Sequence, residues 1–499
     1  MHDVVIVGAG PVGLFLAGEL SLVGCSVLVL ERGREPRSPL KAFPLGMRNL
    51  SAASAEALHR RGLLQPLLTE LGAGEASDVD GSVRAAGHFA GITPDAAGVD
   101  LAALPPRLPS PALDGRLTSL EAVEVVLAER AVRLGVEIRR GVQVTAVEQD
   151  EEGVVARSGE DEYAARWLVG CDGGRSTVRS LAGFDFVGTE PWFTGYVVHA
   201  TIGGAEKLRK GFVLTSGGLY LNEPVPGYLA FEDFDDGTFD RSRTPSREHL
   251  QTVLRRASGT DVTIDEVHLA SSFTDRAMQT STYRRGRVLL AGDAAHVHSP
   301  LGGQGLNLGI GDALNLGWKL GAVVRGRLPE ALLDTYTRER HPVAQRVLDW
   351  TRAQVAVMRP GPYASALQEV VRDLLMTGDG ATYVYQRLSG MSVRYDLGGD
   401  HPLVGRSAPE FRLEDGTRLA DLLQDGRGVA LDFTGAQRLR STAGDWADRV
   451  RYASGKAVDD LGHGAVLLRP DGVVVWADGH EPDLAAFAKA ATEWFGQPG

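Results

Sequence analysis

Two glycine-rich segments have residue types and spacings that suit phosphate and nucleotide chemistry. The first, Gly8-Ala9-Gly10-Pro11-Val12-Gly13, follows the apolar run Val4–Val7 and precedes a helical pattern over residues 14–20. Gly8 permits a tight turn, Gly10 lets the backbone approach a pyrophosphate, and Gly13 lets helix and strand pack closely. Pro11 and Val12 open the helix, whose free N–H groups and positive dipole end attract phosphate. The segment therefore predicts a dinucleotide site.

An acidic residue follows the next apolar run. Residues 27–30 read as a strand that ends in Glu31, which is followed by Arg32. A carboxylate at this distance from a glycine turn is suited to binding ribose hydroxyls. A glycine turn alone is weak evidence because such turns are common, but here strand, glycines, helix, strand and acid occur in order. We therefore expect dinucleotide binding rather than an ordinary surface turn.

The second glycine-rich segment favours a flavin over a nicotinamide as the resident cofactor. A strand over residues 288–290 runs into Gly292-Asp293, and Pro300 precedes Gly302–Asn307 and a helix from about 308 to 324. Asp293, at a strand end, can accept hydrogen bonds from a polyhydroxyl chain such as ribityl. The backbone N–H groups of Gly302–Asn307 lie at a helix start and suit the electron-rich pyrimidine edge of a flavin. Together the two segments predict FAD.

The elements that must position these segments divide the 499-residue chain into several units. Residues 1–183 read as the first part of a Rossmann-like FAD-binding domain, with an excursion toward a substrate domain near 76–105. Residues 184–272 predict an inserted, mostly antiparallel β-sheet domain that binds substrate. Residues 273–340 return to the FAD-binding domain, 341–400 read as a helical segment, and 401–499 read as a small α/β domain. The expected fold class is therefore α/β combined with α+β.

Net charge, cysteine content and hydropathy disfavour a nucleic-acid partner, a disulfide framework and a membrane span. The formal net charge of −12 disfavours a nucleic-acid partner, since phosphate binding relies on Lys and Arg. Two cysteines, Cys25 and Cys171, are too few for a disulfide framework and indicate a reducing compartment. The N-terminus has no basic leader, and no apolar stretch suggests a membrane span. We expect a cytoplasmic protein that is a monomer or a homodimer.

Three motifs give the chain a resemblance to a known family. They are Gly8–Gly13 with Glu31-Arg32, Cys171-Asp172-Gly173-Gly174-Arg175-Ser176 with Arg179, and Gly292-Asp293 through Asn307. The chain resembles the group A flavoprotein monooxygenases, which share the p-hydroxybenzoate hydroxylase fold, and within them the hydroxylases of aromatic polyketides. The likeness spans about residues 4–340. Many such hydroxylases end in a thioredoxin-like domain, which residues 401–499 resemble, but this domain has no cysteine and we expect no redox role for it.

The resemblance implies roles for individual residues. Asp172 and Gly173 are expected where both FAD and a passing nicotinamide cofactor are contacted, Asp293 at the ribityl chain, and Pro300 beside the flavin near the substrate. Lys41 and Arg48 keep the family's spacing for a segment beside the flavin and its phosphates. Lys41 departs from the family's arginine and lacks its planar fork, and Leu120 lies near where relatives often carry a glutamine on the flavin. The expected cofactor contacts are Gly8, Gly10, Pro11, Val12, Gly13, Glu31, Arg32, Lys41, Arg48, Leu120, Val144, Asp172, Gly173, Asp293, Pro300, Gly302, Gly303, Gly305, Leu306 and Asn307.

The implied activity is oxygen transfer carried by the cofactor. NADPH or NADH would bind transiently and reduce the flavin, O₂ would add to give a C4a-hydroperoxide, and one oxygen would pass to a bulky polyketide or other aromatic natural-product intermediate. No Ser-His-Asp arrangement or metal-ligand cluster is visible, so we assign no catalytic side chain and no metal, and His296 and His298 read as structural. Strand aromatics are candidates to line the pocket, although they more often form plain core: Tyr196, Phe212, Tyr220, Tyr228 and Phe231.

Other functions fit parts of the same pattern. Some relatives keep FAD as a scaffold and catalyse a redox-neutral cyclisation, and their motifs would look nearly the same. A flavin halogenase is disfavoured because no Trp-x-Trp pair occurs among the seven tryptophans. A non-enzymatic FAD-dependent interaction module is the remaining class, with the C-terminal domain as its binding part.

Overall fold

The computed structural model describes residues 1–72, 87–222, 226–435 and 439–499. Its central element is an eight-stranded sheet of order β16-β17-β8-β1-β2-β5, to which β7 and β6 are added beside β8. β17, β8, β1, β2 and β5 run parallel. The strands are β1 His2–Val7, β2 Val27–Glu31, β5 Glu137–Arg140, β6 Ala146–Gln149, β7 Val154–Ser158, β8 Asp161–Gly170, β16 Arg284–Arg285 and β17 Val288–Leu290.

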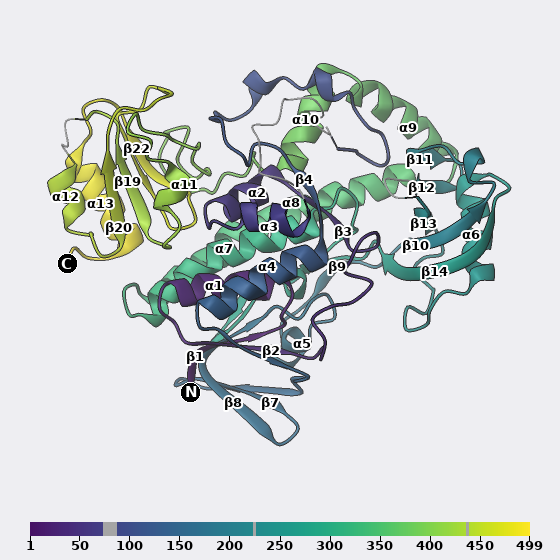
Figure 1. The fold of residues 1–499 in the computed structure, drawn as a ribbon, viewed down its shortest axis with the longest axis horizontal. Helices are drawn as coiled ribbons and strands as arrows, with labels where there is room; N and C mark the ends of the chain where they lie inside the picture. The colour runs from purple at the N-terminus through teal and green to yellow at the C-terminus, as the bar shows by residue number, and fades with distance from the viewer. Residues whose placement is uncertain (73–86, 223–225, 436–438) are drawn as a thin grey trace.

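Continuous apolar runs explain why these strands form a parallel, covered sheet. Val4, Val5 and Ile6 of β1 are fully buried, as expected for a strand with both faces covered. α1 (Pro11–Leu22) packs between α4 (Leu120–Arg133) and α7 (Gly305–Val324) on one face of the sheet (Figure 1). The smaller helices on and beside this domain are α2 Ala52–His59, α3 Leu64–Glu70 and α5 Thr177–Leu181.

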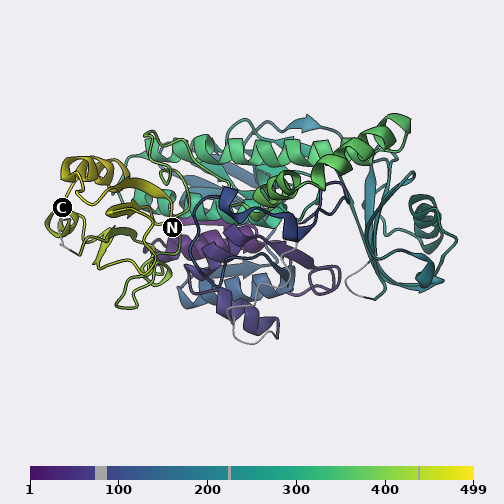
Figure 2. The same ribbon diagram turned by 90° about the horizontal axis from the view of Figure 1, so that it is seen from above.

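A five-stranded antiparallel sheet of order β11-β12-β13-β10-β14 forms the second domain. α6 (Arg247–Ser258) covers one of its faces. Tyr196, Val198 and Phe231 point to this face, because side chains alternate along a strand, and they pack against the apolar side of the helix. The opposite face turns toward the FAD-binding domain and the long helix α8 (Asp334–Met358), as Figure 2 shows. The strands are β10 Thr194–Gly203, β11 Gly211–Thr215, β12 Gly218–Asn222, β13 Tyr228–Asp233 and β14 Thr263–Thr274.

Two small sheets join this domain to the central one. A three-stranded sheet comprises β18 (His296–Val297), β15 (Ala277–Gln279) and β9 (Val187–Thr189). A two-stranded sheet pairs β3 (Met47–Leu50) with β4 (Arg116–Ser119).

Three helices follow the FAD-binding domain along the chain. Residues of the predicted excursion near 76–105 pack against one of them. α8 (Asp334–Met358), α9 (Pro362–Leu375) and α10 (Gly378–Ser389) run along one side of the molecule. Residues 73–86 lie outside the described part of the chain. Residues 87–105 include two short 3₁₀ turns, Ala96–Gly98 and Leu101–Ala103, and contribute Phe89 to an apolar cluster with Trp350 of α8.

The C-terminal domain is a four-stranded mixed sheet of order β20-β19-β21-β22 with helices beside it. Figure 2 shows this domain and the antiparallel sheet at opposite ends of the FAD-binding domain. The predicted fold class is confirmed, and the described helices include none that is long and apolar enough to cross a bilayer. The elements are α11 Leu419–Leu422, β19 Gly428–Asp432, α12 Arg440–Gly444, β20 Val450–Ser454, β21 Ala465–Leu468, β22 Val474–Asp478 and α13 Leu484–Phe495.

Candidate functional site

The predicted motifs meet at one edge of the parallel sheet. Val7 at the end of β1 is in register with Leu30 of β2 and with Gly170 of β8, and Gly170 is in register with Leu290 of β17. The residues that follow these strand ends therefore lie side by side. Carboxyl ends of parallel strands are where open α/β sheets bind their ligands. We call this region, formed by residues 8–13, 31–33, 171–174 and 291–307, the cofactor edge.

The three glycines of the first motif have different surroundings. A Cβ at Gly8, whose φ is +109°, would collide with the carbonyl oxygen of Cys171, and a Cβ at Gly13 would collide with that of Gly8. A Cβ at Gly10 would meet nothing within 4 Å. Gly8 and Gly13 are thus needed for close packing of strand and helix, whereas Gly10 borders open space. Pro11 and Val12 start α1, which has no side-chain cap at Gly10, so its first N–H groups face that space.

Glu31 holds the glycine turn from the neighbouring strand. Its Oε2 accepts a hydrogen bond from the backbone N–H of Ala9 at 2.8 Å, and its Oε1 accepts one from that of Gly33 at 2.7 Å. The carboxylate therefore lies across the mouth of the turn and is half-buried. Arg32 is exposed and lies outside this contact.

Asp172, in the motif formed by residues 171–176, caps a helix. The Asp172 carboxylate accepts hydrogen bonds from Ser176 Oγ and from the backbone N–H groups of Thr177 and Val178 at the start of α5. Gly173 has a φ of +81°, and a Cβ there would meet nothing within 4 Å. The motif thus presents a rigid turn to open space beside the glycine loop.

The side chain of Arg48 lies between the cofactor edge and the antiparallel sheet. Arg48 of β3 donates through Nη1 to the carbonyl oxygens of Leu45 and Met47. Burial lowers the pKa of its guanidinium, while Tyr228 and Asp293 act electrostatically in the opposite direction. Arg48 therefore lies where β3, the turn after β17 and the first residue of β13 converge.

Lys41 forms an ion pair with Glu124, a residue that was not predicted from the sequence. Its Nζ lies 2.6 Å from Oε2 of Glu124 on α4. Burial raises the pKa of Glu124, against the opposing effect of Lys41. The backbone N–H of Leu120, the first residue of α4, donates to the carbonyl of Gly46 and so joins the same segment. Glu124 lies in a regular helical pattern, so only its pairing with the distant Lys41 distinguishes it.

The glycine loop before α7 is tied to β3 by one side chain. Asn307 Nδ2 donates to the carbonyl oxygens of Asn49 and Gly303, both at 2.8 Å, and its Oδ1 accepts from the backbone N–H of Ser51 at 2.8 Å. Gly302 and Gly303 both have positive φ, which lets the loop turn tightly after Pro300. Gly305 and Leu306 begin α7 with no side-chain cap, so backbone N–H groups remain available there.

Beneath this loop lies a buried charge cluster that the sequence did not reveal. Asp312 on α7 lies 2.6 Å from His296 Nε2 and 2.7 Å from Arg340 Nε. Burial alone would raise the pKa of Asp312, but His296 and Arg340 outweigh it and hold that pKa below its usual value. Asp312 also accepts from the backbone N–H of Gly292 beside Asp293. The cluster therefore fixes the turn that carries Asp293.

The remaining predicted site residues are Val144 and the aromatic candidates for the pocket. Val144 is buried, with 3% of its surface exposed, and it lies two residues after Val142, whose backbone N–H donates to the carbonyl of Glu31. Among the aromatic candidates for the pocket, Tyr196, Tyr220 and Phe231 point toward α6 and form the core of the antiparallel sheet domain. Tyr228 and Phe212 lie on the opposite face, because strand side chains alternate.

Several features of the cofactor edge fit FAD. Open space at Gly10 and Gly173 leaves room for a pyrophosphate and an adjoining chain, and uncapped N–H groups of α1 and α7 face it. His298 Nε2 is buried without a hydrogen-bond partner among the described residues, and a Cβ on Gly305 would lie 3.6 Å from it and 3.9 Å from Asp293 Oδ1. A polar group supplied by a ligand would satisfy this nitrogen.

Comparison with known sequences identifies the family. A family described as "FAD binding domain" matches residues 1–351, and one described as "Aromatic-ring hydroxylase, C-terminal" matches residues 401–498. The chain belongs to the FAD-dependent aromatic-ring hydroxylases. It is therefore a flavoprotein monooxygenase, an oxidoreductase with FAD as its cofactor, as its sequence predicted.

Individual relatives match over essentially the whole chain. A monooxygenase of Claviceps purpurea is 43% identical, covering 100% of this chain and 98% of that protein. A rifampicin monooxygenase of Streptomyces venezuelae is 40% identical, with 99% of both chains covered. The solved structure of OxyS, an anhydrotetracycline hydroxylase from Streptomyces rimosus, superposes with a TM-score of 0.85 at 36% identity over 100% of both chains. A dialkyldecalin synthase of Streptomyces rugosporus is also similar, at 35% identity over 99% of both chains.

Proposed function

We propose that this monooxygenase hydroxylates a bulky polyketide or related aromatic natural-product intermediate, with NADPH or NADH as transient reductant. The observation that carries the proposal is the packing of Leu301, directly after Pro300 of the cofactor edge, in one apolar cluster with Phe193 and Leu219 of the antiparallel sheet domain. A substrate held against that sheet face would adjoin the flavin. Relatives that oxidise rifampicin and anhydrotetracycline support a large substrate.

Individual residues of the cofactor edge would hold the FAD. The uncapped start of α1 would bind the pyrophosphate, Glu31 the ribose, Asp293 the ribityl chain, and the backbone N–H groups of the loop before α7 the pyrimidine edge. When bound, FAD would supply the redox chemistry that delivers one oxygen atom of O₂. Arg48 would provide positive charge beside the flavin, and Asp172 would keep its turn rigid.

The face of the antiparallel sheet opposite α6 is suited to a large apolar molecule. Leu301, directly after Pro300, packs in one cluster with Phe89, Phe193 and Leu219. This contact joins the flavin loop to the substrate domain and would exclude water between them. Exclusion of water protects an activated oxygen from loss before it is transferred.

A redox-neutral cyclase is the second candidate, and the similarity to a dialkyldecalin synthase favours it. Anaerobic mixing of the holoenzyme with NADPH or NADH, followed by flavin absorbance, separates the two functions. A monooxygenase will bleach the flavin band, and a bulky aromatic substrate will accelerate the bleaching. A flavin that stays oxidised while the substrate is isomerised contradicts the hydroxylase proposal and supports the cyclase.

A further inference from the structure

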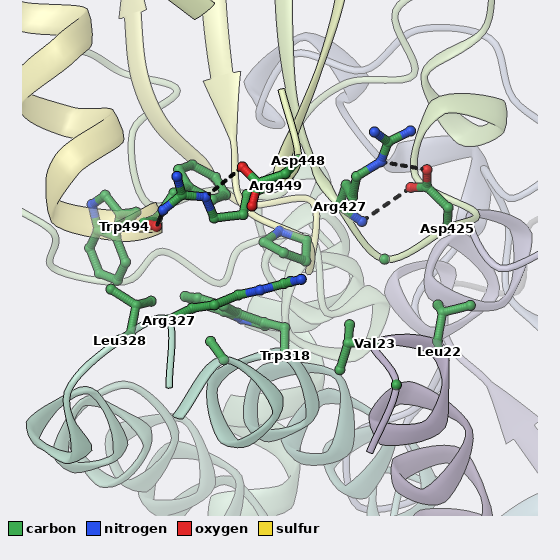
Figure 3. Close-up of a pocket in the computed structure, with 15 residues that line it drawn as sticks. Leu22, Val23, Trp318, Arg327, Leu328, Asp425, Arg427, Asp448, Arg449 and Trp494 are labelled. Atoms are coloured by element: carbon green, nitrogen blue, oxygen red, sulfur yellow. Dashed lines mark hydrogen bonds and ion pairs between the residues drawn. The ribbon is translucent and has the colours of Figure 1, made fainter. Parts of the chain in front are cut away.

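A cavity of about 330 Å³ lies between the FAD-binding domain and the C-terminal domain (Figure 3). The end of α1, the second half of α7 and the loop after it form one side, and loops before β19 and β20 with the end of α13 form the other. Trp318 is thirteen residues beyond Gly305 on α7, which places it about 20 Å along the helix from the cofactor edge. The cavity is therefore separate from the site described above.

Aromatic rings form the inner wall of this cavity. Trp318, Trp494 and Phe495 line it, and each is at least nine-tenths buried. The rings of Trp318 and Trp494 have centroids 6.4 Å apart, and the guanidinium of Arg469 lies 5.2 Å and 4.8 Å from them. Arg469 thereby holds both rings in place. Leu22, Val23 and Leu328 extend the apolar surface, which suits a flat hydrophobic molecule.

One buried polar atom of the wall has no partner. Trp318 is 4% exposed, and its Nε1 makes no hydrogen bond within the described part of the chain. Buried N–H donors are nearly always satisfied, by protein, by water or by a ligand. The described residues therefore supply no acceptor for this indole N–H.

The rim of the cavity has an excess of positive charge. Arg427 pairs with Asp425 at 2.8 Å, and Arg449 pairs with Asp448 at 2.9 Å, as Figure 3 shows. Arg327 also lines the cavity and is exposed, and it has no ion-pair partner among the described residues. Three arginines and two aspartates thus leave one lining cation without a counter-charge.

We propose that this cavity binds a planar aromatic carboxylate, with its rings against Trp318 and Trp494 and its carboxylate at Arg327. Because both domains contribute walls, the bound molecule links the C-terminal domain to the FAD-binding domain. The site gives the cysteine-free C-terminal domain a ligand-binding role that does not depend on the monooxygenase reaction.

Isothermal titration calorimetry of the FAD-loaded full-length protein with 2-naphthoate tests the proposal. The wild type will bind the carboxylate at least about tenfold more tightly than the neutral isostere 2-naphthamide, since a charge-assisted contact is lost. Arg327→Met will weaken 2-naphthoate to the level of the amide. Arg325→Met removes a neighbouring exposed arginine that does not line the cavity, and it will bind as the wild type does.

A variant that fills the cavity tests whether 2-naphthoate binds there. Ala322 lines the cavity from α7, and Ala322→Phe will abolish the binding heat while the flavin content stays unchanged. Trp318→Phe, which makes one ring of the wall smaller, will weaken binding as well. Equal binding by the wild type and Ala322→Phe would put 2-naphthoate in another pocket and overturn the proposal. Binding of acid and amide with equal affinity, or no binding at millimolar probe, would overturn it too.

Discussion

The cofactor edge and the interface with the C-terminal domain handle polar groups in opposite ways. At the cofactor edge, the glycine turns border open space, and helix starts present uncapped N–H groups. At the interface, charged side chains are fully buried and paired: Arg469 lies 2.9 Å from Glu339 and 2.6 Å from Asp471, and Lys319 lies 2.9 Å from Glu339. The cofactor edge is built to receive a ligand, whereas the ion-pair cluster around Glu339 satisfies its charges within the protein.

A second cluster strengthens the interface. Glu19 of α1 pairs with Arg61 at 2.7 Å and with Arg130 at 2.9 Å, and Arg61 also donates to the backbone carbonyls of Leu423 and Pro470 in the C-terminal domain. Breaking such contacts would leave unpaired charges in a buried place, which is costly. The C-terminal domain is therefore fixed to the FAD-binding domain, and it is not a loosely attached module.

Gly10→Ala is the most sensitive test of the cofactor edge. The protein itself has room for the methyl group, so the fold will be retained. The methyl would, however, occupy the space in which we propose that the FAD pyrophosphate binds. We expect FAD affinity to fall by about a hundredfold, measured by flavin fluorescence on titration of the apoprotein. Gly479→Ala, in similarly open space in the C-terminal domain, will leave the affinity unchanged. Unchanged affinity in Gly10→Ala would show that the pyrophosphate lies elsewhere.

The closed interface is tested by Arg469→Met. The change leaves Glu339 and Asp471 buried without their shared partner, and we expect a loss of roughly 3–5 kcal/mol in the free energy of unfolding. Arg418→Met breaks an exposed pair with Asp421 in the same domain and will cost no more than about 1 kcal/mol. Denaturant unfolding measures both. Equal losses would mean that burial does not set the strength of the interface.

Acid should weaken the interface through Glu339. Burial would raise its pKa, but Arg469 and Lys319 outweigh burial and lower that pKa to about 2. Its stabilising contribution is fully present above the unfolded pKa near 4.5 and is lost as the pH falls toward 2. Unfolding measured between pH 5 and pH 2 will show a shallower pH dependence in Arg469→Met than in the wild type. Parallel curves would exclude the ion pair as the cause.

The smallest expected effect concerns Lys41, whose partner Glu124 lies close enough to Glu31 of the cofactor edge for the two carboxylates to interact electrostatically. Lys41→Met leaves the carboxylate of Glu124 without its partner, and we expect FAD affinity to fall by about three- to tenfold. Lys41→Arg keeps the charge and adds a planar fork, so its affinity will match or exceed that of the wild type. If both variants bind FAD equally well, the charge at position 41 does not contribute to the site.

The same contrast explains what could be predicted from the sequence. Gly8–Gly13, Glu31, Asp293 and Gly302–Asn307 are local patterns, and a local pattern carries its own geometry, so the fold class and the family followed from them. The partners Glu124, Asp312 and Glu339 lie in ordinary helical patterns, and only tertiary packing brings them to Lys41, His296 and Arg469.

Strand alternation could have sorted the aromatic residues of the antiparallel sheet into two faces. It could not have shown which face α6 covers, because Tyr196 and Tyr228 are both apolar enough for either side. Packing of the amphipathic helix α6 decides it, since that helix buries Leu250, Val253 and Leu254 against the sheet.

Transfer of one oxygen atom from O₂ to the substrate is tested with labelled oxygen. The holoenzyme is mixed with NADPH, ¹⁸O₂ and bulky aromatic polyketides, with anhydrotetracycline and rifampicin as the first probes, and products are analysed by mass spectrometry. We expect a product that carries one ¹⁸O atom, formed with consumption of NADPH. A product of unchanged mass, formed without NADPH or O₂, would rule out oxygen transfer and leave FAD as a scaffold.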